Sequence, residues 1–143
     1  MKRLFLSLAV AALATASVLA APTDDEVAAR RTALEVAGAF GNDGFKLRDG
    51  NWTGMIEIGK PKVIQVNLYA GNQYWFTLGS VPAAKKVKVT VYDEGGKPVE
   101  IDPYEEASVA AAGFSPETSG SFYVKVEEIE GTPAAFCLVY SYK

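Results

Sequence analysis

The side chains best suited to binding a ligand are aromatic residues that alternate with apolar positions in the second half of the chain. Alternation that points Phe76 and Leu78 inward leaves Trp75 pointing outward. The predicted outward-facing set consists of Trp75, Tyr69, Tyr92, Tyr123, Gln65, Asn67 and Lys88. Flat aromatic rings beside amides suit a sugar ring, whose C–H face packs on the π surface while its hydroxyls form hydrogen bonds. This set predicts a polysaccharide-binding face.

The same aromatic residues have a second interpretation. A helix predicted near the amino end has an apolar stripe that needs a partner, and that stripe can cover the aromatics instead. The chain is then a structural or interaction protein, and a protein such as a cell-surface protein adds a strand to its sheet edge. The helix position distinguishes the two: a helix lying across Trp75 rules out the glycan face, whereas a helix packed elsewhere leaves it open.

Carboxylates supply the other candidate chemistry, because glycoside hydrolysis needs two of them across one cleft. The candidates are Glu57, Glu100, Asp102, Glu105, Glu106, Glu127, Glu128 and Glu130. Most occur in adjacent runs typical of loops and strand exteriors. The chain also has no histidine, so the usual general base of serine and cysteine hydrolases is missing. We therefore expect a non-catalytic protein.

Metal and cofactor sites are equally poorly supported. The single cysteine, Cys137, can form neither an intramolecular disulfide nor a Cys-rich metal site, and its apolar neighbours predict a buried small hydrophobe. Asp43 with Asp49, and Asp93 with Glu94, have oxygen ligands for calcium, but neither pair fits the spacing of an EF-hand. Turn formation explains both pairs, and we expect no metal or cofactor.

The first twenty residues have the composition of a secretory signal peptide. Lys2 and Arg3 precede an apolar run, and small residues lead to a predicted cleavage site between Ala20 and Ala21. No cysteine follows the run, and no later stretch approaches the ~20 apolar residues of a membrane-spanning helix. We expect a soluble protein exported to the periplasm or the cell exterior.

Charge argues against a nucleic-acid partner. Cleavage removes two of the 14 basic side chains and none of the 17 acidic ones, so the net charge changes from −3 to −5. Binding to phosphates depends on clustered Lys and Arg. The only basic cluster, Lys85 to Lys88, fits a solvated strand edge protected by lysine.

The elements that position these residues are one helix followed by strands. Thr23 and Glu26 have the spacing of a capping box, and strong helix formers predict a helix from Asp24 to Phe40. With its turn-rich linker, this segment covers residues 21–50, between the signal peptide (1–20) and a β domain (51–143). Expected strands are Met55–Ile58, Val63–Tyr69, Tyr74–Leu78, Val87–Tyr92, Val99–Ile101, Ser108–Phe114, Phe122–Glu127 and Phe136–Tyr142. Short strands without intervening helices predict an antiparallel β-sandwich with one amino-terminal helix.

Four stretches carry a family resemblance: residues 66–76, 87–97, 114–116 and 119–126. Together they resemble the bacterial pre-peptidase C-terminal (PPC-like) domain, over about Lys62 to Tyr142. The resemblance implies a jelly-roll-like β-sandwich of the kind found at the ends of secreted hydrolases, some of which bind substrate or matrix. Family members often carry an aspartate before the central strand, where this chain has Lys85 and Lys86. No peptidase precedes the domain, so we expect an exported binding or accessory module.

Overall fold

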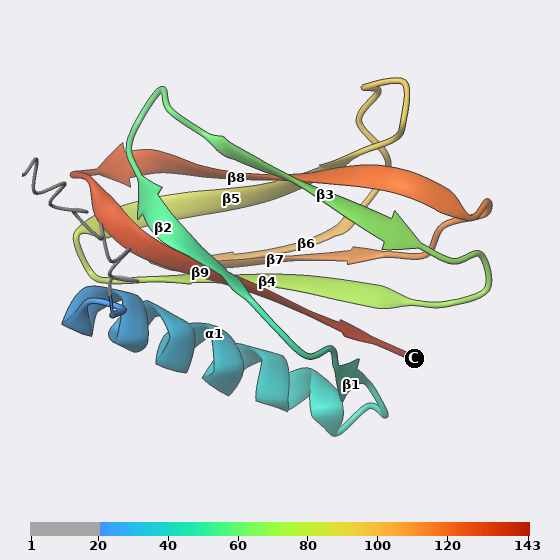
Figure 1. Cartoon of the computed structure of the whole chain (residues 1–143), viewed down its shortest axis with the longest axis horizontal. Helices are drawn as coiled ribbons and strands as arrows, with labels where there is room; N and C mark the ends of the chain where they lie inside the picture. The colour runs from blue at the N-terminus through green and yellow to red at the C-terminus, as the bar shows by residue number, and fades with distance from the viewer. Residues whose placement is uncertain (1–20) are drawn as a thin grey trace, which may run out of the picture.

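The computed structural model describes residues 21–143, and its only described helix is α1, Asp24–Gly41 (Figure 1). The Thr23 side chain accepts a hydrogen bond from the Glu26 amide at 3.1 Å and so caps the helix. The helix begins where the sequence predicted and ends one residue later. The predicted signal peptide, residues 1–20, lies outside the described residues. Within residues 21–143 no helix is long and apolar enough to cross a membrane.

The strands form two antiparallel sheets, and the predicted β-sandwich with one amino-terminal helix is confirmed. The larger sheet has the order β1-β9-β4-β7-β6, with β2 also pairing with β9. Its strands are β1 (Lys46–Leu47), β2 (Trp52–Ile56), β4 (Tyr74–Ser80), β6 (Asp102–Glu106), β7 (Val109–Phe114) and β9 (Ala134–Tyr142). The smaller sheet has the order β3-β8-β5, with bounds Lys62–Leu68, Gly120–Gly131 and Ala84–Tyr92.

The core lies between the sheets and follows the predicted alternation. Val87, Val89 and Val91 of β5 are buried, as are Val124 and Val126 of β8. Their intervening neighbours point to the outer face of the smaller sheet. Lys85, Lys86 and Lys88 are exposed on β5, an outer strand of that sheet, as expected for a lysine-protected edge.

Three parts of the strand prediction differ from the structure. The strand predicted at Met55–Ile58 is β2, which runs from Trp52 to Ile56. Val99–Ile101 is not a strand; Val99 only donates a backbone hydrogen bond to Val91, and the strand begins at Asp102. This strand, β6, is exposed along its whole length at the edge of the larger sheet, so no apolar alternation marks it in the sequence. The two-residue strand β1 is too short to leave any periodic signal.

The helix packs on the outer face of the larger sheet, beneath β4 and β9 in Figure 1. It buries a row of small residues, Ala29, Ala33 and Ala37. Opposite them lies Gly79 of β4: a Cβ atom there would sit 2.6 Å from the Ala29 carbonyl oxygen. Small residues on both elements thus bring the helix backbone against the strand, and the helix lies over only one of the two sheets.

Candidate functional site

Trp75 is on the outer face of the larger sheet, and the end of the helix covers one side of its ring. The Phe40 and Trp75 rings stack with centroids 4.3 Å apart and planes 5° apart. The indole also lies against Gly113 of β7, where an added Cβ would come within 3.0 Å of ring carbons. Trp75 is nevertheless only half-buried. The helix therefore lies across Trp75, which is the position expected if the helix covers the aromatics, but it leaves part of the indole accessible.

The other predicted site residues belong to the smaller sheet, on the opposite side of the sandwich. Gln65 on β3 pairs in register with Tyr123 on β8, and Tyr123 pairs with Tyr92 on β5. Lys88 lies further along β5, Asn67 further along β3, and exposed Tyr69 follows β3. The helix does not cover this face. The structure therefore groups six of the predicted residues with one sheet and separates Trp75 from them.

Several polar side chains of this outer face bond to one another. The Gln65 amide donates to the Ser121 hydroxyl at 3.3 Å, and that hydroxyl donates to the Asn67 side-chain oxygen at 3.2 Å. Lys125 forms an ion pair with Glu127 at 3.5 Å. A ligand on this flat face has to compete with these contacts, because a polar group gains little when it exchanges one partner for another.

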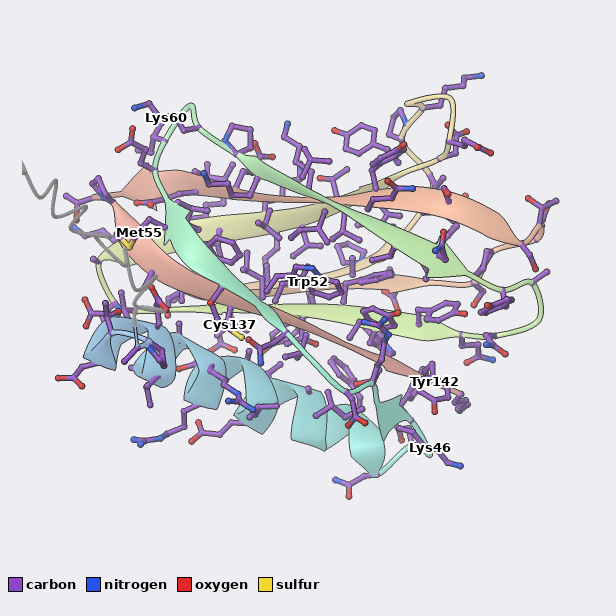
Figure 2. All side chains as sticks on the ribbon, in the orientation of Figure 1. Lys46, Trp52, Met55, Lys60, Cys137 and Tyr142 are labelled. Carbon is purple, nitrogen blue, oxygen red and sulfur yellow. The ribbon has the colours of Figure 1, made fainter. Side chains whose placement is uncertain are left out.

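A concave site lies elsewhere, at the end of the sandwich where several connections meet. This end cleft has a volume of about 800 Å³. Residues from the start of β4, from the β5–β6 connection and from the β7–β8 connection line it. These connections lie toward the right-hand end of Figure 1, and Figure 2 places Tyr142 at that end and Lys60 at the other. The volume falls within the range of about 300–1,000 Å³ of small-molecule sites.

The end cleft combines aromatic rings with hydroxyl groups. Its aromatic residues are Phe45, Tyr74, Trp75, Phe114 and Phe122, and its hydroxyl residues include Ser115, Thr118, Ser119 and Ser121. The Phe114 and Phe122 rings meet edge to face, with centroids 5.2 Å apart. The Tyr74 hydroxyl accepts hydrogen bonds from the Tyr69 amide at 2.9 Å and from the Asn72 side chain at 3.1 Å. These contacts hold Tyr74, Phe114 and Phe122 in place without a ligand.

The charge of the end cleft has one sign. Its five ionisable carboxyl groups belong to Asp93, Glu94, Glu100, Asp102 and Glu117. Lys and Arg are absent from the described lining, and the ion pairs within residues 21–143 involve other carboxylates. Asp93 also accepts a hydrogen bond from the Lys97 amide at 2.9 Å, as expected for its predicted turn. The cleft is therefore acidic as well as aromatic.

Two further residues of chemical interest lie away from the end cleft. Glu128 is buried, and the loss of solvent raises its pKa, as does the negative charge of Glu57. Cys137 is buried as predicted; Figure 2 shows it between β9 and α1, and burial raises its pKa to about 11. Such a thiol is a poor nucleophile at neutral pH. The described residues hold no group of three or more His, Cys, Asp or Glu placed to hold a metal.

The sequence contained one signal for the end cleft. The turn-forming stretches at residues 93–96 and 118–120 both interrupt antiparallel strands, and alternate connections in such a chain meet at the same end of the sheets. Several carboxylates and hydroxyls lie in or beside these stretches. Combining the turn positions with the expected strand directions would have placed Glu94, Glu117 and Ser119 at the same end of the two sheets.

Comparisons with protein-family models and with curated proteins found no match for this sequence. The resemblance to the pre-peptidase C-terminal domain therefore stays a prediction, and the structure supplies the β-sandwich without assigning it to a family.

Proposed function

We propose that this chain is an exported, non-catalytic module that binds a glycan in the end cleft. The observation that carries the proposal is the presence of half-buried aromatic rings, hydroxyls and carboxylates around one cavity of about 800 Å³. Sugars need both kinds of contact, because their C–H faces pack on aromatic rings while their hydroxyls form hydrogen bonds. Export and lack of catalysis rest on the amino-terminal sequence and on the missing histidine.

The cleft suits a glycan better than the flat outer face of the smaller sheet does. A concave site surrounds a sugar and removes more of its surface from water than a flat sheet can. The accessible part of Trp75 lines the cleft, with Phe114 and Phe122 also in the lining. Phe40 stacks on the indole and Gly113 lies against it, so a sugar meets Trp75 at its exposed edge, and little side-chain freedom is lost in that contact. In this proposal Trp75 is again a ligand contact, but with other neighbours than those predicted from the sequence.

The test is calorimetric titration of the purified protein with a panel of soluble oligosaccharides. Trp75→Ala should weaken binding about tenfold, which corresponds to about 1.4 kcal/mol. Trp52→Ala is the matched control, because Trp52 packs against Tyr140, is absent from the cleft lining and is also half-buried. The Trp52 variant should retain the wild-type affinity. The saccharide recovered after titration with the wild-type protein should be uncut, as expected of a non-catalytic module.

A second variant separates binding from folding. Thr118→Val removes a cleft hydroxyl on an exposed connection while keeping the side-chain shape, so circular dichroism should be unchanged. It should weaken binding several-fold. Failure of the folded wild-type protein to bind any saccharide in the panel, or equal affinities of the wild type, the Trp75 variant and the Thr118 variant, would refute a glycan site in the cleft.

A second candidate function is protein interaction at the edge of the smaller sheet. The observation that favours it is β3, an outer strand on which Val63 is 59% exposed. An extended segment of a partner can add to such an edge through backbone hydrogen bonds. If this function is correct, Val63→Lys should abolish partner binding in a quantitative assay, whereas Trp75→Ala should leave it unchanged.

A further inference from the structure

The carboxylates of the end cleft come from separate segments that face a common space. Glu94 and Glu100 lie on the connection between β5 and β6, Asp102 begins β6, and Glu117 lies between β7 and β8. Like charges around a cavity with low-dielectric walls focus a negative potential there. Glu100 and Glu117 are exposed at the cleft, so both can reach a ligand directly. A positively charged ligand is attracted to this site and an anionic one is repelled.

We infer that the ligand is a cationic amino sugar, an oligosaccharide whose free amino groups are protonated. This inference rests on the proposed function and narrows it to a chemical class. The Phe114 ring and the exposed edge of Trp75 contact the sugar rings, while Glu100 and Glu117 pair with the ammonium groups. An N-acetylated sugar has the same ring but no charge, so it gains only the first of these interactions. Charge is then what selects among glycans of similar shape.

A matched pair of ligands tests the inference. The probes are a soluble glucosamine oligomer and the N-acetylglucosamine oligomer of the same length and linkage, titrated at a mildly acidic pH that keeps the free amines protonated. The glucosamine oligomer should bind at least tenfold more tightly. Raising the salt from about 0.05 M to about 0.5 M should remove most of that difference, since exposed ion pairs are screened.

A matched pair of variants locates the effect. Glu100→Gln combined with Glu117→Gln removes two charges from two different connections that line the cleft and should weaken binding of the glucosamine oligomer at least tenfold. Glu105→Gln combined with Glu130→Gln makes the same change at exposed positions that the cleft lining does not include, and should leave the affinity unchanged. All four positions are exposed, so both proteins should fold. The salt dependence of the wild type is an independent readout.

The outcomes separate this inference from the function on which it rests. Equal affinity for the two oligomers would overturn the selection by charge and leave the glycan-binding module in place. Binding of neither oligomer, nor of any neutral saccharide, would overturn both. Binding of spermidine without either oligosaccharide would also overturn the inference, because the acidic cleft would then recognise a polyamine.

Discussion

Glu128 occupies a core position on β8 although it carries a carboxyl group. It continues the inward row of Val124 and Val126, and its side chain is 2% exposed. Neither of its carboxylate oxygens has a hydrogen-bond partner among the described residues. Burial raises the pKa of Glu128, and the nearby charge of Glu57 raises it further. An ionised carboxylate in this position lowers the stability of the fold, because the lost hydration is not replaced.

Glu128→Gln should therefore raise the free energy of unfolding at neutral pH. The folded protein holds the Glu128 proton more tightly than the unfolded chain, in which the pKa has its ordinary value of 4.5. The contribution of Glu128 to stability is thus fully present below pH 4.5 and is lost as the pH rises through the raised pKa of the folded state. The advantage of the Gln variant should be smallest in acid and grow toward neutrality.

Urea unfolding at a series of pH values from about 4 to about 8 measures this difference. Glu130→Gln is the control, since it makes the same change at an exposed position on the same strand. Its stability should follow that of the wild type at every pH. A Glu128→Gln protein less stable than the wild type at neutral pH would contradict the argument.

At the scale of elements, the contact between α1 and β4 decides which aromatics are covered. The buried face of the helix consists of alanines, which let its backbone approach the sheet at Gly79. Phe40, the last residue but one of the helix, then reaches Trp75. Helices with larger residues on this face would stand further from the sheet, where a stack at 4.3 Å between these two rings could not form.

Gly79→Ala should disrupt this contact. The added Cβ would lie 2.6 Å from the Ala29 carbonyl oxygen and 2.9 Å from Ala33 Cα, and neither backbone atom can move without shifting the helix. We expect a loss of about 1–3 kcal/mol of stability from overpacking. Trypsin should also cut faster after Arg30 and Arg31, because the helix is displaced. Urea unfolding and timed proteolysis measure the two effects.

Gly38→Ala is the matched control for this substitution. Gly38 lies in the same helix, and nothing is within 4 Å of the position of an added Cβ. Alanine there should raise stability by about 0.5–1 kcal/mol, because glycine is a poor helix former. If Gly79→Ala proved as stable as the wild type, the close packing between helix and strand would not be what holds the helix in place.

Residue patterns were sufficient to predict most of the helix and strand positions, but they were insufficient to predict how these elements pack together. The helix was predictable because Thr23 and Gly41 mark its ends, and β5 and β8 because valine alternates with polar residues. Strand β6 was not predictable from its sequence, because an exposed edge strand needs no apolar residues. The stack of Phe40 on Trp75 joins residues that no local pattern connects. It follows from the packing at Gly79, which is a tertiary contact.

At the scale of the whole molecule, the candidate site is a property of the assembled sheets. Its carboxylates and rings come from connections far apart in the chain, and each connection alone reads as an ordinary turn. The residues that were predicted as a single face instead lie on both sides of the sandwich, because the order of strands in the two sheets is not encoded in alternation. Trp75 is the residue common to the predicted face and the end cleft.

The proposed function requires that the protein is exported and meets its ligand outside the cytoplasm. Export can be tested separately. The helix and both sheets lie within residues 21–143, so cleavage after Ala20 leaves every described element in place. Expressed with the full amino-terminal sequence in a bacterial host, the protein should appear in the periplasm or medium with Ala21 as its first residue. Intact-mass spectrometry of cell fractions measures this.

Ala20→Asp places a charge where signal peptidase needs a small residue, and should leave the uncleaved chain with the membrane fraction. Recovery of the full-length wild-type chain from the cytoplasm would contradict export and remove a glycan outside the cytoplasm as the ligand of the end cleft.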